Sequence, residues 1–453
     1  MTANPSTIAT SENRLVFGLG ETGRSVARWW RQQGVVFDAL DTREEMADDP
    51  AVRAEIGSSR VVFGEPDASL FEGCSEMIVS PGVALDHPLI ARAAERGCRI
   101  RGDIDLFMEA ATAPVVGITG SNGKSTVTSL LGAMIDACGI TVSIGGNLGR
   151  PALDLLADAP DLFVLELSSF QLERSEPLGL QLATVLNVSA DHLDRYSSMA
   201  EYHQAKHAIF KQAHHVVANR DDPLTVPLLP DSVPVTWWRL GEPDLNEFGL
   251  REIDGAEWLC QGLTPLMRVD EIRIPGTHNQ ANVLVALALG SALGMPMAGL
   301  LEGAKRFAGL AHRCQLVGDV NGVRFIDDSK GTNVGATVAA LHGLSGAGRI
   351  WLILGGQGKG QSFAPLRELV ASHCAGLILL GEAAEEIAEQ LGDVASIARV
   401  SSLEAAVQQA AAQAKAGDTV LLSPACASLD MFSSYQERGD RFQDAVQALE
   451  VAA

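Results

Sequence analysis

The chain has 453 residues, a hydrophobic content of 47% and a formal net charge of −22 at pH 7. The length predicts about two to four domains with a large core, and the acidic surface disfavours nucleic acid or an anionic membrane as a partner, because both bind basic faces. The seven cysteines form no CxxC pair, which is typical of reduced thiols and argues against a zinc site or a disulfide framework. The polar N-terminus and the absence of an apolar run of ~18 residues predict no signal peptide and no membrane span, so we expect a cytoplasmic protein.

The first block, residues 1–102, begins with a nucleotide-binding pattern. An apolar strand over 15–18 leads into GLGETG at 18–23, and a helix and a second strand then deliver Asp41. A GxGxxG with an acid about 20 residues later is typical of dinucleotide sites and, alone, favours an NAD-dependent dehydrogenase. The same glycines admit any nucleotide diphosphate, because they only let the backbone approach phosphate. A later strand ends in SPG at 80–82, which is either a second contact or a plain turn.

The second block, residues 103–309, carries the most informative segment of the chain. An apolar strand runs into GSNGKS at 120–125, and apolar residues then recur at helical spacing as far as Gly139. Strand, glycine loop and helix form a phosphate cradle, in which Lys124 adds charge and the Ser125 hydroxyl can hold Mg2+. The loop is a shortened variant, since the strict P-loop pattern requires glycine at position 118, where this chain has isoleucine. A glycine turn with an incidental lysine is the simpler alternative.

Two further strand ends of this block carry polar side chains. The apolar run 162–165 delivers Glu166, and the run 183–188 leads to His192. Because ligands of parallel α/β sheets bind at the carboxyl ends of strands, we expect both side chains to converge on the phosphate loop and to form a Mg2+ shell there. An edge salt bridge for Glu166 and a helix cap for His192 are the alternatives.

The third block, residues 310–453, alternates predicted strands and helices again, which indicates a second doubly wound sheet. Strands are expected over 323–326, 350–354, 377–380 and 420–422. One intervening helix is predicted to begin with a capping box at Ser401 and Glu404. Lys330 and Lys359 follow two of the strands, where they are either ligands or ordinary surface lysines.

Several segments, in their order along nearly the whole chain, resemble the Mur ligases, which add amino acids to a nucleotide-linked precursor of peptidoglycan. These segments are 119–126, 166–172, 187–196, 276–282 and 312–313. Two more, 328–333 and 422–430, are similar to the branch of that family that adds D-glutamate. The resemblance implies an α/β protein of three domains: a Rossmann-like UDP-binding domain over 1–102, a central P-loop ATPase-like parallel sheet for ATP over 103–309, and a Rossmann-like amino-acid-binding domain over 310–453.

The activity that the resemblance implies is ATP-dependent ligation of D-glutamate to UDP-N-acetylmuramoyl-L-alanine. Phosphorylation by ATP converts the alanine carboxylate into an acyl phosphate, because a carboxylate does not react with an amine at neutral pH. The glutamate amine then attacks, and phosphate leaves. Mg2+ and basic side chains are required to bring the like-charged groups together. We expect ATP and Mg2+ as cofactors, no nucleic acid partner, and a monomer.

The resemblance also assigns residues to each ligand, and it identifies the N-terminal glycine loop as a uridine diphosphate site. The contacts to the UDP-linked substrate are Glu21, Thr22, Asp41, Thr42, Arg43, Ser80, Pro81, Gly82, Asn147, Gln171 and His192. Those to ATP are Gly120, Ser121, Asn122, Gly123, Lys124, Ser125, Thr126, Asn282, Arg313 and Asp328. Those to the amino acid are Thr332, Lys359, Ser428, Leu429 and Tyr435. The catalytic group is Lys124, Glu166, His192 and Lys206, and the metal ligands are Ser125, Glu166, His192 and Lys206.

Lys206 is assigned by the resemblance alone, since in the sequence it is an ordinary helix lysine. The family carries a lysine here as a carbamate, N6-carboxylysine, which forms when an uncharged, desolvated amine takes up CO2 and so becomes an anionic metal ligand. The chain departs from the family at two places among the matched positions. Tyr435 replaces a phenylalanine but keeps the ring, and Cys314-Gln315 replaces Phe-Glu, which leaves the contacts behind Arg313 open.

Other functions stay open from the residues alone. A dehydrogenase would use the N-terminal glycine loop but leaves the Lys124 loop unexplained. A non-enzymatic nucleotide-binding protein would need no amino acid substrate. The nearest alternative in chemistry is a sister ligase that adds L-glutamate, alanine or a diamino acid, because the preference for the D isomer rests on the resemblance.

Overall fold

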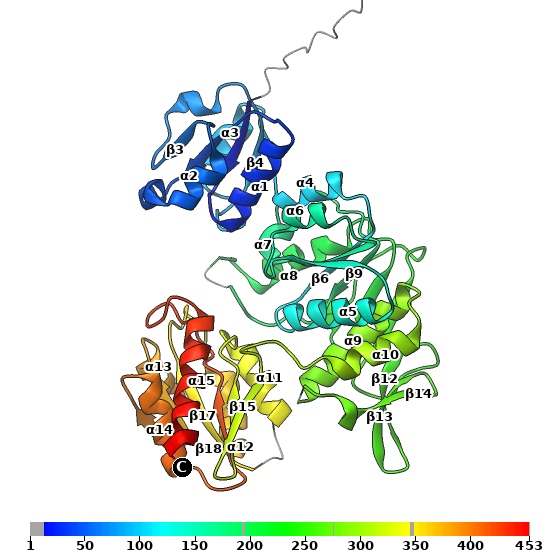
Figure 1. Cartoon of the computed structure of the whole chain (residues 1–453), viewed down its shortest axis with the longest axis vertical. Helices are drawn as coiled ribbons and strands as arrows, with labels where there is room; N and C mark the ends of the chain where they lie inside the picture. Colours follow the sequence, from blue (N-terminus) through cyan, green and yellow to red (C-terminus); the bar gives the residue numbers. More distant parts are fainter. Residues whose placement is uncertain (1–12, 193–194, 275, 345–347, 453) are drawn as a thin grey trace, which may run out of the picture.

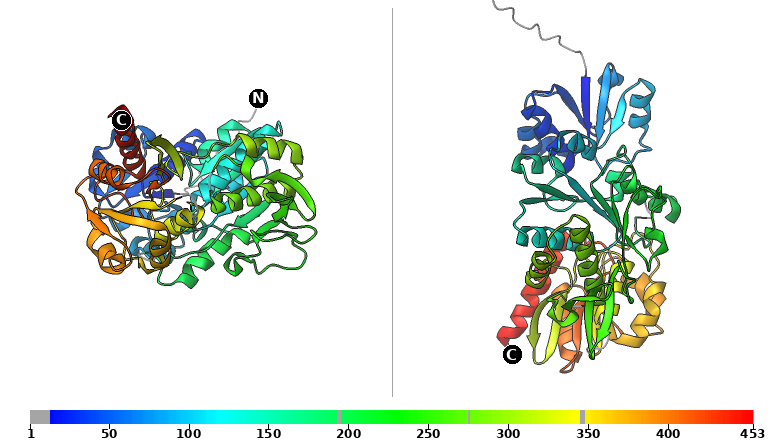
Figure 2. Two further views of the ribbon diagram at one scale, coloured as in Figure 1. Left: turned by 90° about the horizontal axis from the view of Figure 1, so that it is seen from below. Right: turned by 90° about the vertical axis from the view of Figure 1, so that its right-hand side faces the viewer.

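The computed structural model describes residues 13–192, 195–274, 276–344 and 348–452, and it consists of three α/β units: the first lies above the central unit and the third lies beside its lower half (Figure 1). Each unit is built around its own sheet, with five, nine and six strands. The side view in Figure 2 shows the same order from the N-terminal unit at one end to the C-terminal unit at the other. The expected fold class is confirmed. In the described part of the chain, no helix combines the length and the apolar character that crossing a membrane requires.

The first unit is a parallel sheet with strand order β3-β2-β1-β4-β5. Its strands are β1 Asn13–Phe17, β2 Phe37–Asp41, β3 Val61–Phe63, β4 Cys74–Val79 and β5 Arg99–Arg101, and its helices are α1 Glu21–Gln32, α2 Pro50–Ile56 and α3 Pro88–Glu95. The predicted glycine loop joins β1 to α1. Gly18 has a φ of +89°, and a Cβ on Gly23 would lie 1.8 Å from the Gly18 carbonyl oxygen, so both positions require glycine.

The central unit has the strand order β14-β13-β12-β11-β10-β9-β6-β8-β7. Its strands are β6 Val115–Thr119, β7 Val142–Gly146, β8 Leu162–Glu166, β9 Leu182–Val185, β10 Val216–Asn219, β11 Val235–Trp238, β12 Phe248–Ile253, β13 Ala256–Gln261 and β14 Thr264–Arg268. Its helices are α4 Asp103–Ala110, α5 Lys124–Ala137, α6 Ala152–Leu155, α7 Ser169–Leu172, α8 Met199–His207, α9 Thr277–Ala292 and α10 Met297–Arg306. The seven strands β6 to β12 pair in parallel. β13 and β14 extend the sheet as antiparallel strands, and the sequence did not indicate this extension.

The third unit has the strand order β15-β16-β20-β17-β18-β19, with β15 antiparallel to β16. Its strands are β15 Gln315–Val320, β16 Val323–Asp327, β17 Ile350–Gly355, β18 Cys374–Leu380, β19 Ile397–Arg399 and β20 Thr419–Leu422. Its helices are α11 Val334–Leu344, α12 Arg367–His373, α13 Ala384–Leu391, α14 Leu403–Gln413 and α15 Tyr435–Ala452. All four predicted strands are present. The predicted capping box is wrong by one residue, because Ser402 is the N-cap of α14 and its hydroxyl accepts from Ala405 N at 3.2 Å.

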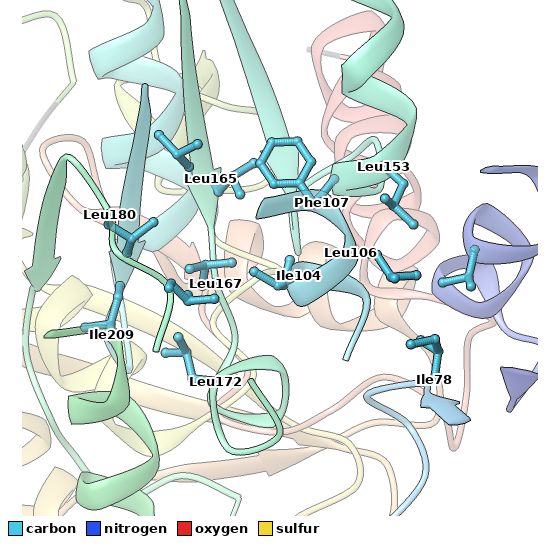
Figure 3. Close-up of a cluster of buried hydrophobic side chains, with 14 of the residues drawn as sticks. Ile78, Ile104, Leu106, Phe107, Leu153, Leu165, Leu167, Leu172, Leu180 and Ile209 are labelled. Atoms are coloured by element: carbon cyan, nitrogen blue, oxygen red, sulfur yellow. The ribbon is translucent and has the colours of Figure 1, made fainter. Parts of the chain in front are cut away.

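One hydrophobic cluster is shared by the first and central units. It contains Ile78 of β4, Ile104 and Phe107 of α4, and Leu165 of β8, all at most 1% exposed, and Figure 3 shows α4 lying between the two sides. The third unit has clusters of its own around β17 and β20. The first unit is therefore packed onto the central unit through a common core, whereas the third contacts it where α11 lies against α9 and through the polar groups described next.

Candidate active site between the central and third units

A cavity of about 800 Å3 lies where the strand ends of the central unit face the third unit. The phosphate loop, Glu166 and His192 come together there, as the strand-end argument predicts. The assigned residues that line it are Ser121, Asn122, Gly123, Lys124, Ser125, Thr126, Asn147, Glu166, His192, Lys206, Asn282, Arg313, Asp328, Thr332 and Lys359. Residues more than 200 positions apart in the chain thus form one site.

The phosphate loop is held in a fixed shape by its neighbours. Gly123 is the N-cap of α5 with φ +82°, and a Cβ there would lie 2.8 Å from Asn282 Oδ1, so only glycine fits. Asn187, just beyond β9, accepts from Asn122 N at 2.9 Å and donates to Asn122 O at 3.0 Å. These bonds to Asn187 fix the loop, and the N-terminus of α5 at Lys124 and Ser125 lines the cavity, which is the arrangement of an anion site at a helix N-terminus.

Two lysines converge on one carbonyl of this loop. Lys124 Nζ donates to Gly120 O at 2.8 Å and to Ser121 O at 2.9 Å, and Lys206 Nζ donates to the same Gly120 oxygen at 2.9 Å. Burial lowers the pKa of Lys124, and burial together with the charge of Lys124 holds the pKa of Lys206 well below its usual range. Lys206 is 1% exposed, so its surroundings favour the uncharged amine.

Glu166 has one carboxylate oxygen without a hydrogen-bond partner. The side chain is 2% exposed, Oε1 accepts from Asn147 Nδ2 at 2.7 Å, and Oε2 has no partner among the residues that the structure describes. No ion pair within 4.0 Å joins Glu166 to a cation in the same described ranges. The structure thus argues against the edge salt bridge and leaves Oε2 as a buried acceptor without a partner, which is a costly arrangement unless a ligand or ion supplies one.

His192 faces the cavity from a loop with a positive φ of 55°. Its backbone N–H donates to Asp191 Oδ1 at 2.9 Å, and its ring packs edge-on against Phe170 with centroids 4.8 Å apart. It is not a helix cap, because Ser198 caps the following helix α8. Leu193 and Asp194, which belong to the motif at 187–196, lie outside the described residues.

Three residues of the third unit close the site. Arg313 Nη2 donates to Ser125 Oγ at 2.7 Å, and Asn333 Nδ2 donates to Asp191 Oδ2 at 3.0 Å. Asp328, 7% exposed, accepts from the Ser423 hydroxyl at 2.7 Å, and burial raises the pKa of Asp328 to about 7. The third unit therefore contacts the phosphate loop directly through polar groups.

Two further residues face the site: Lys330, whose role is open from the sequence, and Asn333, which has no predicted role. Lys330 lines the cavity with its Nζ 4.1 Å from the centre of the Tyr435 ring, and burial, Arg313 and Lys124 lower the pKa of Lys330 to about 8. Asn333 lies in the segment 328–333 that carries the resemblance, and its place in that segment is the feature of the sequence that could have marked it as a site residue. The Gln315 departure keeps a contact behind Arg313, because its Oε1 accepts from His312 N at 3.0 Å.

The residues assigned to uridine diphosphate lie outside this cavity, at the carboxyl ends of β1, β2 and β4 of the first unit: Glu21 and Thr22 begin α1, Asp41 ends β2, and the others lie in the loops after β2 and β4. Asp41 accepts from Leu19 N at 2.7 Å and pairs with Arg43 through both oxygens. Ser80 begins a turn in which Val83 N donates to Ser80 O at 2.9 Å. The first unit thus presents a separate strand-end surface, at the loops expected for a nucleotide diphosphate.

Five other assigned residues also lie away from the cavity wall, and one of them is Gly120, whose carbonyl oxygen accepts from Lys124 and Lys206. Gln171 is 3% exposed, and its side chain accepts from Ser168 N at 3.1 Å and donates to Asp103 Oδ2 at 3.2 Å. Ser428 is 3% exposed and Leu429 is 66% exposed, while Tyr435 begins α15. Of the residues assigned to the amino acid, the structure therefore brings Thr332 and Lys359 onto the wall, but not Ser428, Leu429 or Tyr435.

The donor set fits Mg2+ better than a transition metal. No cluster of three or more His, Cys, Asp or Glu side chains with metal-binding geometry occurs in the described part of the chain. Mg2+ is commonly held by one or two carboxylates, with phosphate oxygens and water completing its shell. The free Oε2 of Glu166 beside the phosphate loop suits such an ion.

Comparison with known proteins identifies three family profiles along the chain: "Mur ligase MurD-like, N-terminal domain" over 12–102, "Mur ligase middle domain" over 118–290 and "Mur ligase, glutamate ligase domain" over 312–426. Proteins named UDP-N-acetylmuramoylalanine--D-glutamate ligase are similar over almost the full length. The one from Pseudomonas aeruginosa is 51% identical over 98% of this chain and 100% of its own, and that from Acinetobacter baylyi is 48% identical over 96% and 98%.

Solved structures show the same fold at low identity. The UDP-N-acetylmuramate-alanine ligase of Thermotoga maritima has a TM-score of 0.60 at 18% identity, over 96% of this chain and 99% of its own. A pseudomurein peptide ligase type C of Methanothermus fervidus has a TM-score of 0.58 at 18% identity, over 97% and 100%. The profiles and the relatives at about half identity lead to one conclusion: the chain belongs to the Mur ligase family.

Proposed function

We propose that this protein is an ATP-dependent ligase that adds D-glutamate to UDP-N-acetylmuramoyl-L-alanine in peptidoglycan precursor synthesis. The observation that carries the proposal is the meeting of the phosphate loop, Glu166 and Arg313 of the third unit in one cavity. The names of the relatives at about half identity supply the substrates. We further propose that it acts in the cytoplasm as a monomer, since a single chain supplies every residue assigned to the cavity.

The proposed domain boundaries fall between the sheets. β5 ends at Arg101 and α4 begins at Asp103, and α10 ends at Arg306 whereas β15 begins at Gln315. Division at 102/103 and 309/310 assigns one sheet to each ligand: the UDP moiety to the first, ATP to the second and the amino acid to the third.

The reaction proceeds in two steps in this proposal. A carboxylate oxygen of the alanine attacks the γ-phosphorus of ATP, and ADP leaves, which gives an acyl phosphate. The neutral amine of glutamate attacks the acyl carbon, and phosphate leaves with that carboxylate oxygen. Lys124, Arg313 and the N-terminus of α5 offset the repulsion between carboxylate and triphosphate. Glu166 and Ser125 would hold Mg2+, which would supply further charge neutralisation when bound.

We assign Lys206 as a carbamate in the active enzyme. Its amine is buried and shares the Gly120 oxygen with Lys124, so an uncharged form is favoured over a second ammonium. Two ammonium groups at this distance would repel each other. Uptake of CO2 by Lys206 replaces that repulsion by an attraction, because a carbamate is an anion beside the Lys124 cation. With His192, the carbamate would form a second site for Mg2+ on the side of the UDP-linked substrate.

Replacing Glu166 by glutamine is expected to raise the Mg2+ concentration for half-maximal rate by at least about tenfold, with a smaller effect on nucleotide binding. The reason is that Gln keeps the bond to Asn147 but removes the charge on the orphan oxygen. The measurement is the initial rate against Mg2+ concentration. Glu252→Gln, on the exposed face of β12, is the control, and an unchanged Mg2+ dependence in the Glu166 variant would count against the role.

Replacing Lys359 by alanine is expected to raise the KM for D-glutamate about ten- to over a hundred-fold, since a charge-assisted bond contributes ~1.5–3 kcal/mol. Lys359 lines the cavity from the loop after β17, where it can pair with the side-chain carboxylate of the amino acid. The KM for ATP should change little. Lys415→Ala, at an exposed lysine of the same unit, is the control. If the Lys359 substitution leaves the KM for glutamate unchanged, Lys359 does not bind the amino acid.

The proposed activity is tested by phosphate release with a set of amino acids. D-glutamate, L-glutamate, L-alanine, D-alanine and a diamino acid are each supplied with ATP, Mg2+ and UDP-N-acetylmuramoyl-L-alanine, and the product mass is recorded. We expect phosphate and a mass increase of one glutamate residue with the D isomer. Equal or better turnover with L-glutamate overturns the substrate, no amino-acid-dependent phosphate overturns the ligase, and nicotinamide absorbance on the purified protein would support the dehydrogenase instead.

A further inference from the structure

Arg174 joins the first unit to the central unit through a buried guanidinium, and the less buried Arg195 Nη2 adds one bond to Val83 O at 2.9 Å. Arg174 follows α7 in the central unit, and its side chain is 0% exposed. Its Nη1 and Nη2 groups donate to four carbonyl oxygens of the loop between β4 and α3: Val79 at 3.2 Å, Ser80 at 2.6 Å, Pro81 at 3.4 Å and Val83 at 3.2 Å. This loop carries the SPG turn at 80–82 that we assign to the UDP moiety.

The same side chain is fixed on the cavity side. Its Nε donates to Phe170 O, and the Phe170 ring packs against His192 in the cavity wall. In Figure 1, α7 lies on the side of the central unit that faces the first unit. A Cβ on Gly102 would lie 2.9 Å from Arg174 Cγ, so glycine at the boundary of the two units leaves the space that the arginine stem occupies.

Arginine suits this position better than lysine. The guanidinium presents five N–H donors in a rigid plane, which can serve several carbonyls of one loop and still bond to Phe170. An ammonium has three donors on a flexible stem. Lysine would keep the charge but hold fewer of these oxygens, so it loosens the loop relative to α7.

A substrate that spans two units binds tightly only if their separation is fixed beforehand, because each end then raises the effective concentration of the other. UDP-N-acetylmuramoyl-L-alanine would contact the 80–82 turn at one end and the cavity beside His192 at the other. We propose that Arg174 is a positioning residue that fixes this separation and so sets the affinity for the UDP-linked substrate, an inference that rests on the proposed function.

The test compares Arg174→Lys and Arg174→Gln with Arg101→Lys. Arg101 is a matched control, because its side chain is 4% exposed at the same boundary but pairs with Glu76 and Glu109 instead of the loop. We expect Arg174→Lys to raise the KM for UDP-N-acetylmuramoyl-L-alanine about tenfold and Arg174→Gln to raise it further, with the KM for ATP and the Ki of free UDP within about twofold of wild type. Free UDP reports on the first unit alone.

A second perturbation leaves the arginine in place. Gly102→Ala is expected to shift the same KM by a smaller factor, because the new Cβ displaces the arginine stem. The inference is overturned if the Ki of UDP rises as much as the KM, or if Arg101→Lys gives the same pattern, since both indicate a merely structural role. Thermal melting identifies a variant that fails to fold. If Arg174→Gln is such a variant, the KM of the Arg174→Lys enzyme tests the inference. Wild-type ligation without any shift in the variants refutes this inference alone, whereas absence of wild-type ligation refutes the proposed function.

Discussion

Replacing Lys124 by alanine is expected to lower kcat by at least about 1,000-fold while the Kd of the UDP-linked substrate changes by less than about threefold. The lysine lies in the phosphate loop with its ammonium 2.8 Å from Gly120 O, and no residue of the 80–82 turn lines its cavity. The lost cation would otherwise offset charge on the transferred phosphoryl group.

The measurement is kcat together with the Kd of UDP-N-acetylmuramoyl-L-alanine from titration calorimetry. Lys305→Ala is the control, since that lysine is an exposed partner of Glu271 on α10, far along the chain from the loop. A Lys124 variant that loses affinity for the UDP-linked substrate as strongly as it loses activity would contradict the separation of the two nucleotide sites.

Replacing Lys206 by alanine is expected to leave a nearly inactive enzyme that formate or acetate partly restores. The physical reason is that position 206 supplies an anion in this account, and a small carboxylate can occupy the space that the buried side chain leaves. Rate is measured against the concentration of formate, acetate and methylamine. In Lys124→Ala the same carboxylates should restore nothing, because that residue supplies a cation.

Two outcomes would contradict the carbamate. Rescue of Lys206→Ala by methylamine but not by carboxylates would show that a cation is required at this position. The wild-type enzyme equilibrated with 13C-labelled CO2 should also show a carbamate resonance that the Lys206 variant lacks, and a spectrum without it would refute the assignment directly.

The sequence predicts those parts of the site that a short local motif encodes or that follow directly from a position at the end of a buried strand. The phosphate loop is local, and Glu166 was placed by the rule that polar residues after buried parallel strands meet at one edge of a sheet. His192 follows the same rule, although β9 ends at Val185 and a longer loop carries the imidazole into the cavity.

The parts that the sequence does not predict depend on contacts between distant segments. Arg174 lies more than 90 residues from the carbonyls that it binds, and nothing in its neighbourhood distinguishes it from a surface arginine. The burial of Lys206 depends on the packing of α8 against the phosphate loop. Ser401 and Ser402 are both competent caps, and only the backbone path, extended at Ser402, selects the second.

The cavity is expected to activate the alanine carboxylate by phosphorylation before the glutamate amine attacks. The most direct measurement uses UDP-N-acetylmuramoyl-L-alanine labelled with 18O in the alanine carboxylate, with ATP, Mg2+ and D-glutamate, and analyses the released phosphate by mass spectrometry. The account predicts one 18O atom in each phosphate derived from labelled substrate, because phosphate leaves with a carboxylate oxygen. Phosphate free of 18O, alongside formation of the ligated product, would contradict it.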